Sequence, residues 1–491
     1  MNGQSADKVR RAQWLPQWGP RAAWLALALA MSGIVAVSVA QGRTKMWFGL
    51  VALSAAIVLA SLGRTARLRV LVLAVVLSSL LFGPSAPIPL GLTLTEAMLI
   101  FVALAELLAT PLVGHHKTFD SILGPPYYVP FALFALFGLV ATYINGEVVG
   151  YWPTVCLVPL LILFSVERLT KSTDDVLWLV RAAVAAILMF VAIVVLAIAT
   201  GHTQGVGEGA WRLADHRAVA LGPLSFMVWS IRLGSLVAMG LPAALVLAAR
   251  ARHWRERVVY TVIVAALLLT LGLTFARGAT IAAAAGGVVA MLVSRRVRMT
   301  SAVFGLGVVL LIAVVAGPAL LTLLPRQGIE RFAVLGRGLG SVYNFVYRTK
   351  VMEVTLHGIA GNPLGPGFGY LWDRFRIDES IVYSLILNGT GILGFCAFVA
   401  MLVQLARGYV SGLSRRLREA HPDLAAIGLG TLVAAMVAGV SSHSVFVEPV
   451  QTTVFWVLAA STLVGCMRCR ALERDSIHSA ESTRTDSSLH D

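Results

Sequence analysis

The sequence predicts an all-α, polytopic integral membrane protein with about fourteen transmembrane helices, both chain ends in the cytoplasm and one large periplasmic loop. Three observations predict this class. Hydrophobic residues make up 58% of the 491 residues and charged residues only 13%, which leaves too little polar surface to face water. Apolar runs near the ~20 residues that cross a bilayer recur along the chain. Basic residues collect in alternate connecting segments.

The apolar runs divide the chain into three parts. A basic cytoplasmic N-terminus (1–21) precedes a transmembrane domain (22–473), and a disordered cytoplasmic tail rich in Ser, Thr and Asp is expected over 474–491. The first run follows basic residues as a signal peptide does. It exceeds the ~7–15 residues of a signal core, so we expect it to stay as a helix. The runs are 22–40, 46–62, 68–83, 94–113, 127–144, 149–166, 177–200, 233–249, 258–276, 278–294, 300–324, 381–405, 423–441 and 447–466.

The basic residues orient these runs. With the N-terminus inside, the inward segments hold 26 of the 39 Lys and Arg residues, whereas the short outward loops hold only Arg43, Lys45 and Arg277. Short cytoplasmic loops of membrane proteins carry the excess of positive charge, so this asymmetry predicts an inner-membrane protein with both termini inside.

Charge and cysteine content exclude other classes. The net charge of +15 is scattered between apolar runs, so no nucleic acid partner is expected. The four cysteines predict no disulfide framework. Cys466 and Cys469 form a lone C-x-x-C without a second ligand pair, so no metal is expected.

Two segments interrupt the rhythm of helix and short loop, and both face outward. They span about 201–232 and 325–380. Guanidinium groups bind phosphate oxygens bidentately and stay charged, so arginines kept in outward loops suggest an anionic ligand. The alternative is that these arginines pair with loop carboxylates or lipid headgroups. The basic residues of the two segments are Arg212, Arg217, Arg232, Arg326, Arg331, Arg337, Arg348, Lys350, Arg374 and Arg376.

Arg277 and a glycine-rich stretch are the sharpest local features. Arg277 interrupts the apolar stretch 267–293, where a charge at the membrane boundary is costly unless a partner compensates. Its alternative role is to reach the lipid headgroups. The stretch 361–370 contains Gly365, Gly367 and Gly369, which let a backbone approach a ligand closely, although Gly and Pro also simply form loops.

The pattern over about 270–400 resembles the O-antigen polymerase and O-antigen ligase superfamily. The likeness consists of Arg277-Gly278 after a span, Arg348 thirteen residues before Gly361, the run Asn362 to Gly369, and Tyr383 with Gly391-Ile-Leu-Gly394 in the next helix. The rest of the chain matches only in hydropathy.

The resemblance implies a glycosyltransferase at the periplasmic face that needs no metal or cofactor. Its partners would be membrane lipids and polyprenyl-diphosphate-linked oligosaccharides as donor and acceptor, with a chain-length regulator or export complex as a further candidate. Ligases carry a His-Asn pair where this chain has Ser380-Ile381, so a polymerase is favoured.

Each expected role has candidate residues. The diphosphate would lie on Arg277, Arg348, Arg212 and Arg217. The base candidates, which the sequence does not rank, are Glu353, His357, Asp378, Glu379 and His443, each with a salt bridge or a polar helix end as its alternative role. His443 is also a candidate for substrate binding. The remaining substrate-binding candidates are Gly365, Gly367, Gly369, Tyr370 and Tyr383, the last equally explained as an interfacial aromatic.

Three other functions remain open. One is an O-antigen ligase acting on a lipid A core. Another is a lipid-linked oligosaccharide flippase, although such transporters carry charge within their helices and show repeats that are not evident here. The last is a scaffold in an export complex, which would leave the outward arginines unexplained.

Overall fold

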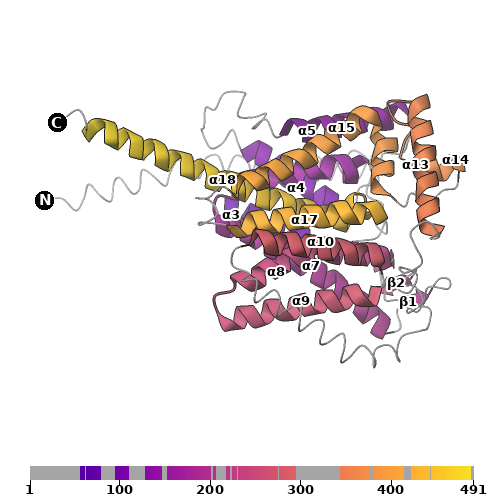
Figure 1. Ribbon diagram of the computed structural model, residues 1–491, viewed down its shortest axis with the longest axis horizontal. Helices are drawn as coiled ribbons and strands as arrows, with labels where there is room; N and C mark the ends of the chain where they lie inside the picture. The colour runs from indigo at the N-terminus through magenta and orange to yellow at the C-terminus, as the bar shows by residue number, and fades with distance from the viewer. Residues whose placement is uncertain are drawn as a thin grey trace, which may run out of the picture.

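The chain folds as a helical bundle with one small sheet at one end (Figure 1). The computed structural model describes residues 56–60, 62–78, 94–109, 128–145, 152–200, 203–205, 217–221, 224–228, 230–274, 276–294, 343–368, 370–375, 381–413, 422–442 and 444–487. The predicted runs 22–40 and 300–324 lie outside these residues, and only the end of 46–62 lies within them.

The other eleven predicted runs each coincide with a helix. Six of these helices, α7, α8, α9, α15, α17 and α18, are long and apolar enough to cross a membrane, and α5 and α10 are shorter apolar helices. A helical membrane protein is thereby supported, whereas the count of fourteen spans and the orientation stay predictions. The helices are α3 (Arg64–Leu77), α4 (Leu94–Ala109), α5 (Tyr128–Ile144), α6 (Val158–Leu169), α7 (Thr173–Ala199), α8 (Ser230–Arg250), α9 (Trp254–Thr274), α10 (Arg277–Val293), α15 (Val382–Ser411), α17 (Pro422–Ser441) and α18 (Pro449–Ser487).

The described parts of the two interrupting segments lie at the same end of the bundle, which we call the loop end. Figure 1 shows the strands there together with α13 (Tyr343–Gly361) and α14 (Tyr370–Phe375), and α13 lies across the long axis of the bundle. The far end of α18 extends from the opposite end. Two short elements complete the described chain, a π-helix at Pro153–Leu157 (η4) and a 3-10 helix at Ser444–Phe446 (η7).

The opposite end, which we call the basic end, collects arginines that pair with neighbouring helices. Arg64 at the start of α3 contacts Asp175 of α7 at 2.8 Å, and Arg468 of α18 donates to the Glu167 carbonyl of α6 at 2.6 Å. Ser172 starts α7 there with a reciprocal capping box, in which its hydroxyl and the Asp175 carboxylate each bond the other residue's backbone N–H. These contacts place several predicted inward segments at one end.

A small antiparallel sheet departs from the all-α prediction. The strands β1 (Thr203–Gly205), β2 (Arg217–Leu221) and β3 (Leu224–Val228) pair in that order. Alternating and β-branched residues favour β2 and β3, and Gly222-Pro223 between them is typical of a turn. Strands of five residues are too short to be recognised in a hydropathy pattern that is dominated by runs of membrane-spanning length.

The core is built around α18. Its apolar window is 94% buried, whereas that of α9 is 22% buried, so α18 is central and α9 peripheral. Phe446, Phe455 and Trp456 stack edge to face near the start of α18. Small residues bring other helices close: a Cβ on Gly286 of α10 would lie 2.5 Å from the Gly430 carbonyl oxygen of α17.

The tail does not follow its prediction. We expected disorder from 474, but α18 continues as a helix to Ser487. Ala471, Leu472, Glu473 and Arg474 are strong helix formers, and extending an existing helix avoids the cost of nucleation. The prediction of disorder rested on the polar composition of this segment, which does not report whether a preceding helix continues into it.

Candidate functional site at the loop end

The candidate site gathers around the C-terminal end of α17. Arg348 of α13 donates from Nη2 to the Ser441 carbonyl at 3.1 Å. The last carbonyls of a helix lack intrahelical partners and carry the negative end of the helix dipole, so a guanidinium is favoured there. Arg348 thereby fastens α13 to the end of the membrane bundle.

Arg277 reaches the same place from α10. A Cβ on Gly278 would lie 2.1 Å from the Ser441 Oγ and 2.4 Å from its Cβ, so only glycine lets the start of α10 contact α17 so closely. Burial lowers the pKa of Arg348, and the positive charge of Arg277 lowers it further. The two arginines predicted to act together are therefore close neighbours.

A third arginine, Arg232, lies near the start of α8, a helix that contacts the start of α10. A Cβ on Gly234 would lie 3.1 Å from the Ala276 Cβ, so the start of α8 contacts the turn that holds Arg277. Arg232 forms a 2.8 Å ion pair with Glu448, which precedes α18. Neither residue was chosen as a site residue, because no spacing in the sequence connects positions 232 and 448.

The glycine-rich stretch contacts protein backbone. Gly365 and Gly367 adopt φ of 98° and 111°, which non-glycine residues rarely reach. A Cβ on Gly365 would lie 2.5 Å from the Asn388 carbonyl oxygen and 2.7 Å from the Gly391 nitrogen, both on α15. The close approach that we expected toward a ligand is made here toward a membrane helix.

The glycine-rich stretch packs against a break in α15. Gly391 has φ 69° and ψ −175° inside the helix. The groups freed by the break are satisfied by the stretch: the Ile392 N–H donates to the Pro363 carbonyl at 3.0 Å, and the Asn388 carbonyl accepts from Gly367 at 3.0 Å. Irregular backbone is tolerated in a membrane helix where protein covers it.

Side-chain amides also form hydrogen bonds where the glycine-rich stretch, α13 and α15 meet. Asn362 and Asn145 both donate to the Gly365 carbonyl, at 3.0 and 2.9 Å, and Asn388 donates to the Thr355 hydroxyl of α13 at 3.3 Å. Asn388 is fully buried. These amides hold α13, which carries Arg348, at a fixed position over α15.

The two tyrosines lie apart from each other. Tyr370 packs on α13, where a Cβ on Gly358 would lie 2.6 Å from its ring. Tyr383 donates from its hydroxyl to the Met436 carbonyl of α17 at 2.7 Å. Tyr383 therefore contacts α17 at Met436, about one and a half helical turns before Ser441, whereas Tyr370 supports α13.

Glu353 and His357 lie on the exposed face of α13. They follow Arg348 by five and nine residues, which at 3.6 residues per turn places them roughly 140° and 180° around the helix. The inward face of α13 instead carries Val351 and Thr355. The geometry does not bring either predicted base together with Arg348.

Other predicted site residues are located only in part. Arg217 lies in β2 at the loop end, where its backbone pairs with Val228 and Gly205. Among the described residues, no group of three His, Cys, Asp or Glu side chains could hold a metal ion. Outside the described residues lie Arg212, Gly369, Asp378, Glu379 and His443.

No protein-family model matches this chain, and the search of curated proteins finds no match. Function is therefore inferred from the geometry of the loop end together with the sequence pattern described above.

Proposed function

We propose that this chain is a polysaccharide polymerase, a membrane glycosyltransferase that moves a glycan from a polyprenyl-diphosphate-linked donor to a lipid-linked acceptor. The reaction would take place at the loop end, which we assign to the periplasmic face of a bacterial inner membrane. In the reaction an acceptor hydroxyl oxygen attacks the anomeric carbon of the donor. The bond from that carbon to the diphosphate breaks, the hydroxyl proton passes to a base, and polyprenyl diphosphate leaves.

The observation that carries the proposal is that α13, through Arg348, and the start of α10, at Arg277-Gly278, both contact Ser441 at the end of α17. Arg277 and Arg348 are 71 positions apart in the sequence, and the positive charge of Arg277 lowers the pKa of Arg348. Among the described residues, no carboxylate lies within ion-pair distance of Arg348. Two adjacent cations repel each other, and an anion bound between them would relieve that repulsion.

A diphosphate leaving group suits this pair. Its negative charge grows as the glycosidic bond breaks, and fixed guanidinium groups stabilise developing charge without rearranging. The pair lies where α10, α13 and α17 meet the boundary of the membrane domain, so the diphosphate could bind there while the prenyl chain stays in lipid. The anchored α13 and the glycine contacts supply the rigidity that such positioning needs.

The base would come from segments that adjoin the arginine pair. Asp378 and Glu379 precede α15, and His443 follows α17, so all three are close in sequence to elements of the site. Glu353 and His357 are now weaker candidates because they face away from Arg348. Glu353→Gln and His357→Ala are accordingly expected to leave polymer length unchanged.

The test uses purified protein in liposomes with polyprenyl-diphosphate-linked repeat units as donor and acceptor, followed by gel separation of the products. Arg277→Ala and Arg348→Ala should each lower the rate of polymer formation by about 10²–10³-fold, the range for removing one fixed charge-stabilising donor. The matched control is Arg252→Ala, which changes an exposed arginine at the basic end. Polymer of normal length and rate from both site variants would refute the assignment.

The same variants separate the alternative functions in cells. A polymerase defect leaves single repeat units on the outer face of the membrane, whereas a flippase defect leaves them on the inner face. A ligase defect leaves long polymer attached to polyprenyl diphosphate. Either of the last two patterns would replace the proposed reaction.

A further inference from the structure

A groove of about 340 Å³ lies between α7 and α9, far from the arginine pair. Its lining residues come from Arg181 to Leu188 of α7 and from the first half of α9, counted from the basic end. Because the apolar window of α9 is only 22% buried, this helix is peripheral among the described residues, and the groove beside it lies at the outer side of the part of the bundle that the structure describes. The groove takes no part in the function proposed above.

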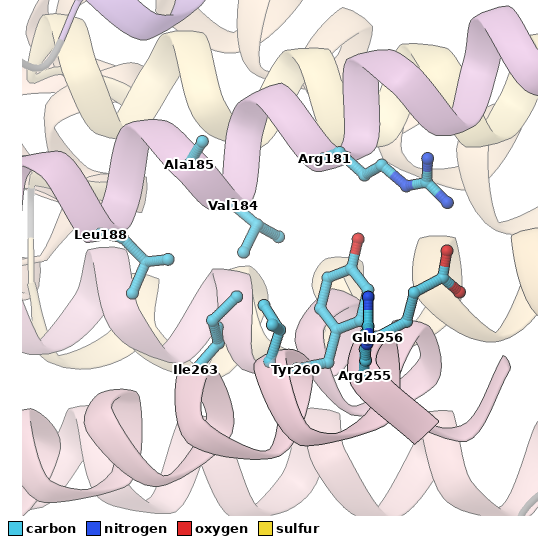
Figure 2. Close-up of a pocket in the computed structure, with 9 residues that line it drawn as sticks. Arg181, Val184, Ala185, Leu188, Arg255, Glu256, Tyr260 and Ile263 are labelled. Carbon is cyan, nitrogen blue, oxygen red and sulfur yellow. The ribbon is translucent and has the colours of Figure 1, made fainter. Parts of the chain in front are cut away.

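The lining changes from polar to apolar along the groove. Figure 2 shows the guanidinium of Arg181, the carboxylate of Glu256 and the hydroxyl of Tyr260 toward one end, and Leu188 and Ile263 toward the other. Leu188 lies seven residues beyond Arg181 on α7, about 10 Å nearer the middle of the membrane. A phospholipid has the same layout, with a polar headgroup at the interface and chains directed inward.

The polar end carries net positive charge. Arg181 and Arg255 contribute two cations against the single carboxylate of Glu256, and Arg252 and Arg257 lie in or next to the α8–α9 turn. Neither Arg181 nor Arg255 forms an ion pair with another described residue, and the Arg255 guanidinium lies 5.9 Å from the ring of Trp254. An anionic headgroup would supply a counter-charge that the described residues around this end of the groove do not.

We propose that this groove is a binding site for an anionic phospholipid of the leaflet at the basic end. The headgroup phosphate contacts Arg181 and Arg255, and an acyl chain lies along Leu188 and Ile263. A water-soluble phosphate would leave the apolar half of the groove unfilled, so the lipid is the occupant that matches both halves. The site is independent of glycosyl transfer at the loop end.

Native mass spectrometry of the delipidated full-length protein tests the site, with phosphatidylglycerol and phosphatidylcholine of identical chains as probes. Phosphatidylglycerol should bind more tightly to the unchanged protein. The double variant Arg181→Gln/Arg255→Gln should weaken phosphatidylglycerol binding by about 30-fold, as expected for two interfacial arginines. The matched control Arg69→Gln, an exposed arginine on α3, should leave the affinity unchanged.

Two further variants keep the test decisive if the double variant does not fold. Glu256→Gln should strengthen phosphatidylglycerol binding, because it removes a like charge. Ala185→Trp should weaken binding of both lipids by filling the groove. Equal affinity for the two lipids, or displacement of lipid by glycerol phosphate alone, would overturn the proposal. So would a wild-type protein that binds neither lipid and is destabilised by Ala185→Trp, since another part of this chain would then occupy the groove.

Discussion

Because the glycine-rich stretch packs against the break in α15, Gly365→Ala is predicted to lower the free energy of unfolding substantially. The new Cβ would lie 2.5 Å from the Asn388 carbonyl oxygen and 2.7 Å from the Gly391 nitrogen. Both are backbone atoms, so no side-chain rotation can relieve the overlap. The positive φ of 98° adds about 1–3 kcal/mol of backbone strain, and overpacking adds another ~1–3 kcal/mol. The expected loss of stability is therefore roughly 2–6 kcal/mol.

The assay is thermal unfolding of the detergent-purified protein, with Gly361→Ala as the matched control. A Cβ on Gly361 meets nothing within 4 Å, and this residue ends α13 with no positive φ. At roughly 2 °C per kcal/mol, Gly365→Ala should melt about 4–12 °C lower, whereas Gly361→Ala should match the unchanged protein or exceed it slightly. If the two variants melt within about 1 °C of each other, the stretch does not contact α15 as described.

Further predictions concern contacts at each end of the bundle. Gly278→Ala should destabilise the protein, because the new Cβ would overlap with Ser441. Adding Ser441→Gly should restore most of the lost stability, which thermal unfolding of the two single variants and the double variant would measure. A double variant as unstable as Gly278→Ala alone would contradict the contact. Arg67→Gln should lower the stability by about 3–5 kcal/mol, because it removes the cation from an ion pair with Glu106 whose side chains are only 11% and 7% exposed. Arg67→Met combined with Glu106→Leu should recover part of that loss in the same assay, and a double variant no better than the single one would argue against a buried pair.

The helices could be predicted from sequence because membrane spans have a local cause. A backbone in lipid must satisfy its own hydrogen bonds, so each apolar run of sufficient length becomes a helix wherever it lies in the chain. Residue types at particular positions also identified Arg277, Arg348 and the 361–370 stretch. The small sheet and the helical continuation of α18 to Ser487 departed from the predicted pattern, because membrane-length hydropathy does not report short strands or polar helices.

Which residues meet was decided by the tertiary structure. Ser441 became part of the site only because Gly278 lets α10 approach α17 and because the helix ends there with an open carbonyl. The pairing of Arg232 with Glu448 joins residues more than two hundred positions apart, and no periodicity encodes such a contact. Sequence alone determined that this chain is a helical membrane protein and that arginines occur in the two long segments between its apolar runs. Packing decided which of them come together, since contacts between helices depend on small residues and helix ends that hydropathy does not report.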